Sequence, residues 1–326
     1  MTILNIGGAG FIGSVATETF IENKHKVIVL DDLSTGFKFL VHPKAKFYQG
    51  SMTNYALLNK IFKKHKIDVV TLYAAKIVVP ESVAKPIDYF LTNVGGLATV
   101  LKAMINNNVK KIVFASSAAV YGSNHTKPIS EDDLKQPCNP YGETKLICEQ
   151  LLMDAKKAHD INYVALRFFN VAGASKTGKY GMAKAKPTLL IPAINDNILN
   201  NKEIKIFGRN YKTRDKTCLR DYIHVQDLAN AASLSIKYLT AKKQSNCFNL
   251  GSGKGYTVLE IVKKCQKLTG RKNFKYNFYP RRSGDPDFLL TNNSKAKKQL
   301  HWTPQYKIDD MILSDWKFRQ KIYDRK

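Results

Sequence analysis

The sequence predicts an α/β fold, namely a doubly wound parallel sheet with a smaller, mixed C-terminal region. Three observations support it. Short apolar runs alternate with helical patterns over residues 1–167, as expected for βα units whose strands are buried on both faces. Glycines follow the first of these runs directly, and acidic residues end the second. Beyond residue 168 the alternation weakens, and a Gly- and Lys-rich stretch precedes shorter elements.

The individual elements follow from this periodicity. In the first part, strands are expected at 3–6, 27–30, 46–48, 69–73, 111–114 and 162–167, and helices at 13–23, 55–64, 89–106 and 141–158. In the second part, we expect a loop at 173–186, a strand at 204–207, and helices at 226–238 and 258–268. Residues 1–167 are therefore predicted to form one domain. Residues 168–326 form a second region, of which segments around 219–245 return to the first.

The composition excludes several classes of protein. The 326 residues are 44% hydrophobic and 24% charged, which is a globular mixture rather than that of a disordered or fibrous chain. A run of about 18 apolar residues is absent, so we expect no membrane span. The N-terminus does not resemble a signal peptide. The 5 cysteines are scattered without a CxxC pair, which favours reduced thiols, a cytoplasmic location and no metal site.

The net charge of +26 comes mainly from lysines spread along the whole chain. Domains that bind nucleic acid usually concentrate basic residues on one face and mix in arginine or aromatic residues. We therefore expect no specific nucleic-acid partner, although a dedicated polyanion site remains the alternative. In either case a positive field attracts an anionic substrate.

The glycine-rich segment from Gly7 to Gly13 lies between the first strand and the first helix. Gly7 allows a tight turn, Gly10 allows a pyrophosphate to approach the backbone, and Gly13 allows close helix–strand packing. The helix N-terminus then offers free N–H groups to phosphate. Asp31 ends the second strand, where a carboxylate can accept the ribose hydroxyls of NAD and repel the 2′-phosphate of NADP; Asp32 is its neighbour. The first domain is thus predicted to be Rossmann-like and to bind NAD.

A second motif provides candidate catalytic residues. Tyr141 and Lys145 lie four residues apart near the start of a predicted helix and therefore share one face. A phenol with a pKa of about 10 can accept a proton only if its anion is stabilised, and a neighbouring ammonium provides this. Ser117 lies just beyond a predicted strand, at the sheet edge where ligands bind in open α/β folds. It could hydrogen-bond the reacting oxygen.

Together these residues resemble the extended short-chain dehydrogenase/reductase family, and within it the enzymes that act on UDP-sugars. The resemblance runs from about Thr2 to Trp316. Its more particular marks are the segments 116–122 (SSAAVYG), 139–142 (NPYG), 167–174 (RFFNVAGA), 220–225 (RDYIHV) and 281–285 (RRSGD).

The resemblance implies roles for individual residues. Ser117, Tyr141 and Lys145 take the catalytic positions. Contacts to NAD are implied for Gly7, Gly10, Phe11, Ile12, Gly13, Asp31, Asp32, Ser51, Met52, Tyr73, Ala74, Ala75, Asn93, Tyr141, Lys145 and Phe169. Contacts to a UDP-sugar are implied for Ser117, Tyr141, Asn170, Leu190, Phe207, Arg220, Arg282 and Asp285. Arginine forks suit a diphosphate, and His224 is expected to be structural.

The chain also departs from the family pattern. Ala119 replaces a frequent Thr, Ser51 replaces an Asp that recognises adenine, and Leu189 replaces a polar residue near the substrate. Leu72 and Ile77 occupy positions where some members have His and Lys, with Lys76 adjacent. Leu289 stands at the position linked to acceptance of N-acetylated sugars, and its intermediate size leaves that choice open.

The implied activity is reversible epimerisation at C4 of UDP-glucose and UDP-galactose, through a 4-keto intermediate with transient reduction of NAD. A homodimer is also implied. Three alternatives remain open: a 4-epimerase of UDP-N-acetylglucosamine, alone or in addition; a non-catalytic NAD-binding regulator; and a nucleic-acid binder. A 4,6-dehydratase is disfavoured, because the segment 117–119 lacks the Asp-Glu pair that dehydration needs.

Overall fold

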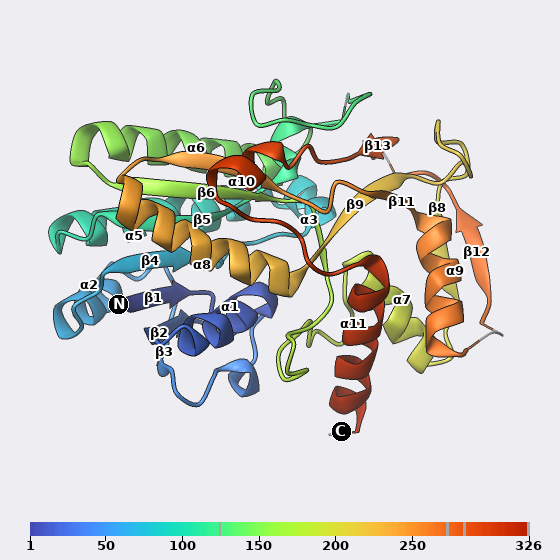
Figure 1. Cartoon of the computed structure of the whole chain (residues 1–326), viewed down its shortest axis with the longest axis horizontal. Coiled ribbons are helices and arrows are strands. Elements are labelled where there is room, and N and C mark those ends of the chain that lie inside the picture. The colour runs from blue at the N-terminus through green and yellow to red at the C-terminus, as the bar shows by residue number, and fades with distance from the viewer. Residues whose placement is uncertain (124, 272–273, 283–284, 325–326) are drawn as a thin grey trace.

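The main sheet has seven parallel strands in the order β10-β6-β5-β4-β1-β2-β3 in the computed structural model of the chain (Figure 1). The structure describes residues 1–123, 125–271, 274–282 and 285–324. The strands of this sheet are β1 (Thr2–Ile6), β2 (Lys26–Asp31), β3 (Lys46–Gln49), β4 (Val69–Leu72), β5 (Lys111–Ser117), β6 (Asn162–Phe168) and β10 (Asn246–Leu250). The strand order reverses between the neighbouring strands β1 and β4: the chain builds β2 and β3 on one side of β1, and β4, β5, β6 and β10 on the other. The predicted doubly wound α/β fold is confirmed.

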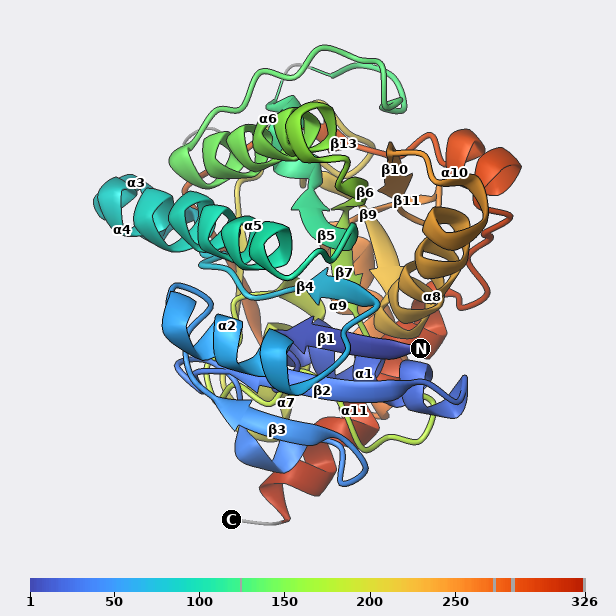
Figure 2. The same ribbon diagram turned by 90° about the vertical axis from the view of Figure 1, so that its left-hand side faces the viewer.

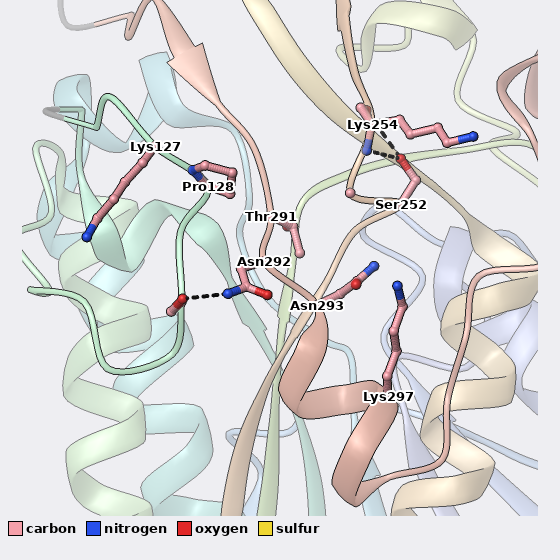
Figure 3. Close-up of a pocket in the computed structure, with 10 residues that line it drawn as sticks. Lys127, Pro128, Ser252, Lys254, Thr291, Asn292, Asn293 and Lys297 are labelled. Atoms are coloured by element: carbon pink, nitrogen blue, oxygen red, sulfur yellow. Dashed lines mark hydrogen bonds between the residues drawn. The ribbon is translucent and has the colours of Figure 1, made fainter.

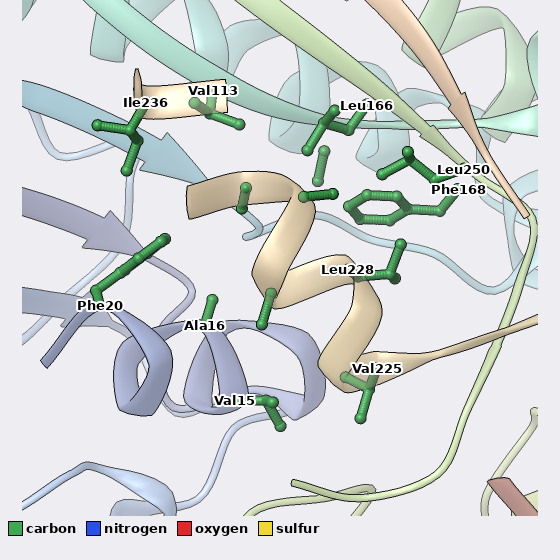
Figure 4. Packing of buried hydrophobic residues seen from close by; sticks show 14 of the residues in the cluster. Val15, Ala16, Phe20, Val113, Leu166, Phe168, Val225, Leu228, Ile236 and Leu250 are labelled. Carbon is green, nitrogen blue, oxygen red and sulfur yellow. The ribbon is translucent and has the colours of Figure 1, made fainter. Parts of the chain in front are cut away.

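Helices cover both faces of this sheet (Figure 2). One face carries α2 (Tyr55–Lys64), α5 (Gly96–Asn106) and α6 (Pro140–His159). The other carries α1 (Phe11–Glu22) and α8 (Val225–Lys242), which pack against each other. Side chains from α1, α8 and the strands, among them Phe20, Leu228 and Leu166, fill the space between them (Figure 4). Near-complete burial of both strand faces explains why β1, β2 and β4 are mainly apolar.

A smaller region follows β6 and lies beside the carboxyl edge of the sheet. Its four-stranded sheet comprises β7 (Asn170–Ala172), β9 (Leu219–His224), β11 (Gly255–Thr257) and β13 (Phe288–Leu289), and its two-stranded sheet comprises β8 (Ile204–Phe207) and β12 (Tyr276–Tyr279). Three helices share one apolar cluster with these strands: α7 (Leu190–Leu199), α9 (Val258–Thr269) and α11 (Ile308–Tyr323). The helix α10 (Ser294–Gln299) lies near β10.

The chain crosses between the two regions more than once. After β9, the helix α8 packs on α1 and β10 pairs with β6 along Asn246–Leu250. The segment 219–245 was expected to return to the first domain. Its strand β9 belongs to the four-stranded sheet, whereas its helix α8 leads into the main sheet. The boundary at residue 167 stays a prediction.

Most predicted elements occur within a few residues of their expected ends, but one helix differs. A single helix was expected at 89–106. The structure instead has three consecutive elements there: α4 (Pro86–Tyr89), a π-helical turn η2 (Phe90–Gly95) and α5. A short helix α3 (Val79–Ala84) precedes them, and the 3₁₀ turns η1 (Lys38–Leu40) and η3 (Ala118–Tyr121) were not predicted. The π-turn contains the buried Asn93, and such turns often occur at functional sites.

Candidate active site

The glycine turn after β1 requires residues without a side chain. Gly7 has φ +87°, and a Cβ there would lie 2.4 Å from the backbone nitrogen of Ala74. A Cβ on Gly13 would lie 2.1 Å from the carbonyl oxygen of Gly7. The helix α1 begins at Phe11, with Gly10 as its N-cap. The turn therefore brings the helix N-terminus close to the carboxyl ends of β1 and β4.

The structure distinguishes the two aspartates that end β2. Asp31 is buried and faces the glycine turn, where its carboxylate accepts hydrogen bonds from the backbone N–H groups of Ala9 and Leu33, each at 2.9 Å. Burial raises the pKa of Asp31 above its usual value, while these two hydrogen bonds lower it. Asp32 is exposed, and its carboxylate accepts from Ser34. Asp31 is therefore the carboxylate placed to meet a ligand at the turn.

Other residues expected at the cofactor follow the same sheet edge. Tyr73, Ala74 and Ala75 continue from β4, and the N–H groups of Tyr73 and Ala74 both donate to the carbonyl oxygen of Ile6. Met52 is buried against Gly96, and Ser51 next to it is partly exposed. The hydroxyl of Tyr73 is buried without a hydrogen-bond partner in the part of the chain that the structure describes.

Asn93 connects this edge to the helix α6. Its amide oxygen accepts from the N–H of Lys76 at 2.8 Å, and its amide nitrogen donates to the carbonyl of Lys76 at 3.0 Å. The same nitrogen donates to the hydroxyl of Thr144 at 3.1 Å. Since Thr144 precedes Lys145, the π-turn fixes the first turns of α6 relative to the loop after β4.

The three expected catalytic residues meet where β5 ends and α6 begins. Ser117 is the last residue of β5, and its hydroxyl oxygen accepts from the N–H of Ala119 at 3.1 Å. Asn139 caps α6 by accepting from the N–H of Gly142 at 2.9 Å, and Pro140 suits the first helical position. Lys145 is 3% exposed, and its Nζ donates to the carbonyl of Ala115 at 2.8 Å.

The electrostatics of the trio follow from burial. Burial raises the pKa of Tyr141, and the nearby Ser117 side chain lowers it. Burial lowers the pKa of Lys145 to about 8, against the attraction of the Cys148 and Glu149 side chains, which raises it. The ammonium lies 5.9 Å from the centre of the Tyr141 ring. A cation this close to the ring favours the phenolate over the neutral phenol.

A second cluster gathers expected substrate residues between β8, β9 and the segment before β13. Arg220 of β9 pairs with Asp285, whose other carboxylate oxygen accepts from the Tyr211 hydroxyl at 2.8 Å. The guanidinium of Arg282 lies 4.1 Å from the ring centre of Phe207, at the end of β8. Two guanidinium groups beside an aromatic ring suit a diphosphate joined to a flat base. Ser283 and Gly284 of the expected motif lie outside the described residues.

Asn170 and Phe169 join the two clusters. Phe169 follows β6, is 6% exposed and donates its N–H to the carbonyl of Leu250. Asn170 begins β7, and its amide donates to the carbonyl of Asp221 at 2.9 Å. Leu190 begins α7 and is partly buried. The sharp change from the main sheet to the four-stranded sheet thus takes place at these two residues.

His224 has a structural role. Its Nδ1 accepts from the N–H of Gln226 at 3.0 Å, which caps α8, and its ring stacks on Tyr306 at 4.1 Å between centres. Burial lowers its pKa to about 4, so the ring is neutral at pH 7. This agrees with the prediction that it is not a catalytic base.

The sequence analysis missed several polar residues of these clusters. Tyr211 supports Asp285, Thr144 binds Asn93, and Glu149 and Arg167 form a buried ion pair behind Ser117. Glu149 lies four residues after Lys145 and therefore on the same helix face, so this spacing was a signal in the sequence that pointed to Glu149. Tyr211 lies in an irregular segment without periodicity, where no comparable pattern exists.

A cavity of about 610 Å³ lies apart from these clusters (Figure 3). Its walls are the segment 127–130, the turn after β10 and the start of α10. None of the expected site residues lines it. In the described ranges, no helix has the length and hydrophobicity needed to cross a bilayer.

A glycine turn with a buried aspartate, followed by a Ser–Tyr–Lys trio at the same edge of a parallel sheet, defines a dinucleotide-dependent enzyme. The chain belongs to the NAD dependent epimerase/dehydratase family, whose sequence profile matches residues 3–251. It is 45% identical to a UDP-glucose 4-epimerase of Lactobacillus helveticus, over 98% of this chain and 97% of the relative.

Solved structures of similar proteins agree. A UDP-glucose 4-epimerase of Stenotrophomonas maltophila, crystallised with NAD and formylated UDP-arabinopyranose, superposes with a TM-score of 0.96 at 33% identity and full coverage of both chains. One from Bifidobacterium longum, in complex with NAD⁺ and UDP, gives a TM-score of 0.93 at 36% identity over 98% of each chain. The predicted family, fold and NAD cofactor are confirmed.

Proposed function

We propose that this enzyme interconverts UDP-glucose and UDP-galactose by epimerisation at C4. The observation that carries the proposal is that Tyr141 and a buried Lys145 lie beside the end of β5, which carries Ser117, at the sheet edge that also holds the glycine turn. Relatives that share nearly the full length of the chain and are UDP-glucose 4-epimerases support this choice of reaction. They do not favour the alternative of a non-catalytic regulator.

The residues at the sheet edge fit NAD. The turn at Gly7 and Gly13 leaves a backbone cradle that a Cβ would fill, and Asp31 faces it from β2. We assign the adenosine half to the surroundings of Asp31 and Met52, and the nicotinamide half to the surroundings of Tyr141 and Lys145. When bound, NAD supplies reversible two-electron oxidation at C4 of the sugar.

The side chains of the enzyme supply the proton chemistry. Tyr141 accepts the proton of the C4 hydroxyl and later returns it, because Lys145 stabilises the phenolate in between. Ser117, at the end of β5, holds the reacting oxygen by a hydrogen bond. Arg220 and Arg282 anchor the diphosphate, so that the sugar can turn and present its opposite face while the nucleotide stays bound.

The size of the C2 substituent that the site accepts is a separate question. Leu289 packs against an apolar cluster that includes Val120, Phe169 and Ala118, the residue that follows Ser117. A side chain of this bulk beside the catalytic serine leaves less room than a smaller residue would. We therefore expect UDP-galactose to be preferred to UDP-N-acetylgalactosamine.

The deciding experiment incubates the purified protein with each of these two UDP-sugars, without added NAD, and follows products by chromatography. UDP-galactose should give UDP-glucose. Tyr141→Phe should lower kcat by at least about 100-fold, because the proton acceptor is removed. Unchanged turnover by that variant, or the absence of turnover by the parent protein even after NAD is added, would reject the proposal.

We further propose that two copies of the chain associate. Large apolar side chains are exposed on α3, α4 and the π-turn: Val83 is 63% exposed, Ile87 68% and Leu91 67%. Ile147 and Met153 of the neighbouring α6 are also exposed. Exposed apolar side chains gathered on helices that contact one another favour a protein partner, and a second copy is the simplest one. The five free cysteines support residence in the reducing cytoplasm.

A further inference from the structure

A buried polar network lies directly behind the catalytic trio, and we name it the Arg167 network. Arg167 of β6 binds both carboxylate oxygens of Glu149 on α6, at 2.9 Å from Nε and 2.6 Å from Nη2. The hydroxyl of Ser116 on β5 donates to the same carboxylate at 2.5 Å. Ser116 and Arg167 are 2% exposed and Glu149 is 5% exposed. The ion pair is thus sealed from water.

The network extends to further elements. The Nη1 of Arg167 donates to the hydroxyl of Tyr121 on η3 at 2.6 Å and to the carbonyl of Glu131 at 3.1 Å. Tyr121 in turn donates to the amide oxygen of Asn249 on β10 at 2.7 Å. One guanidinium therefore holds together α6, η3, β10 and the segment that contains Glu131.

The network touches the catalytic residues through their nearest neighbours in the chain. Ser116 precedes Ser117 on β5, and the β5–β6 register pairs Ser116 with Arg167. Glu149 lies one helical turn after Lys145, on the same face of α6. The carboxylate therefore fixes the distance between the strand end that carries Ser117 and the helix face that carries Tyr141 and Lys145.

Stability alone does not explain such an ion pair. Removing two charges from water is costly, and apolar side chains of similar volume often stabilise a fold as well or better. Hydrogen bonds that satisfy both oxygens of Glu149 instead give it one orientation. A fixed orientation of Glu149 matters because this side chain lies next to the reacting groups. Small displacements of reacting groups reduce reaction rates strongly.

We propose that Glu149, held by Arg167 and Ser116, is a positioning residue for the Tyr141–Lys145 pair and helps to keep Lys145 charged. The inference rests on the proposed epimerase activity. It assigns Glu149 to the Tyr141–Lys145 pair as a supporting residue that touches neither substrate nor cofactor.

Several titratable groups around this pair are held in their uncharged form near pH 7 by burial. Burial raises the pKa of Cys148 to about 11 and those of Tyr89 and Tyr163 to about 12. It also raises the pKa values of Tyr121 and Cys247. The carboxylate of Glu131 accepts from the N–H of Asn249, and Lys135 and Lys295 act on Cys247. Glu149 is therefore the carboxylate that acts on Lys145 most directly.

The first test is the variant Glu149→Gln, which keeps the shape of the side chain and removes its charge. Measured as NAD-loaded enzyme with UDP-galactose, kcat should fall by about 10- to 100-fold while KM stays within about threefold. The alkaline limb of the kcat–pH profile should move down by about half a pH unit, because Lys145 loses an anionic neighbour and deprotonates more easily.

A matched control changes another buried acid that binds an arginine. Asp315 of α11 accepts from Arg319 at 3.2 Å and from Asn195 at 2.8 Å, far from Ser117 in the chain. Asp315→Asn should leave kcat and its pH profile unchanged. If Glu149→Gln does not fold, Ser116→Ala provides the test, because it removes one hydrogen bond to the carboxylate and keeps the ion pair.

A second readout needs neither NAD nor substrate. Unfolding of the parent and of Lys145→Met is compared from pH 6 to 10, with and without Glu149→Gln. Lys145→Met should raise the free energy of unfolding at low pH, and this gain should shrink as the pH rises through the pKa of the folded lysine. In the Glu149→Gln background the gain should begin to shrink at a lower pH than in the parent, because the pKa of Lys145 is lower there.

The results separate the two proposals. A parent protein without epimerase activity contradicts the proposed function. An active parent, with Glu149→Gln or Ser116→Ala matching Asp315→Asn in kcat and in pH profile, overturns the positioning role. A fall in kcat together with the shifted limb supports it.

Discussion

At the scale of single residues, the site depends on an ammonium group kept out of water. Lys145 is 3% exposed, and burial lowers its pKa to about 8 from the usual 10.5. Keeping this group charged at pH 7 costs about 3 kcal/mol, because one pKa unit corresponds to about 1.4 kcal/mol. The fold accepts this cost at the position where a cation stabilises the Tyr141 phenolate.

We predict that Lys145→Met abolishes epimerisation and raises the free energy of unfolding at pH 7 by about 2 kcal/mol, after allowance for the lost hydrogen bond to Ala115. Between pH 8 and about 10.5 the folded lysine is neutral while the unfolded one is still charged, so the parent gains stability and the difference shrinks. Urea unfolding at pH 7 and pH 10 measures this. A variant less stable than the parent at pH 7 contradicts the prediction.

Individual site residues were predictable where a local pattern marked them. Gly7, Gly13 and Asp31 stand at fixed places around the first strand, helix and second strand, and Tyr141 and Lys145 stand one helical turn apart. Arg167 and Glu149 were missed because a buried charge pair leaves no trace in periodicity. Its partners come from β5, β6 and α6, and only the folded sheet brings them together.

At the scale of elements, the first turn of α1 depends on close contact with the strand before it. A Cβ at position 13 would lie 2.1 Å from the Gly7 oxygen, and position 13 is inside a helix, where alanine is otherwise the better residue. Steric exclusion therefore outweighs helix propensity at this position.

We predict that Gly13→Ala lowers the free energy of unfolding by about 3 kcal/mol and weakens retention of NAD, because α1 must move away from β1. The control Gly95→Ala also lies in a helical segment, but its Cβ would meet only the Phe90 oxygen at 3.9 Å. It should raise stability by about 0.5–1 kcal/mol. Thermal unfolding with and without NAD measures both variants, and equal effects would refute the steric explanation.

The elements of the main sheet were largely predictable, whereas in the smaller region only β8 and α9 were expected close to their observed bounds. Strands buried on both faces appear as apolar runs, so β1, β2, β4, β5 and β6 were expected close to their observed bounds. The strands β7, β11 and β13 have three residues or fewer and are stabilised by pairing with their neighbours. β10 was missed because its sequence, NCFNL, mixes polar and apolar residues.

At the scale of the whole molecule, the exposed apolar side chains of α3, α4 and the π-turn favour association with a second copy of the chain. We predict that Ile87→Glu converts a dimer into a monomer, because the charge would be buried without a counterion at the interface. Light scattering after size-exclusion chromatography measures the mass. Phe39→Glu, at a 49% exposed position on η1, should leave the mass unchanged. A monomeric parent protein contradicts the proposal.

The position of β10 affects how the chain reaches its native state during synthesis. β6 is complete at residue 168, but its neighbour on the outer side is made only when the ribosome reaches residue 250. Until then the nascent chain exposes an open strand edge, and α1 lacks the helix that covers it. A fragment ending near residue 167 should therefore aggregate rather than fold, and chaperones should be needed most over this interval of translation.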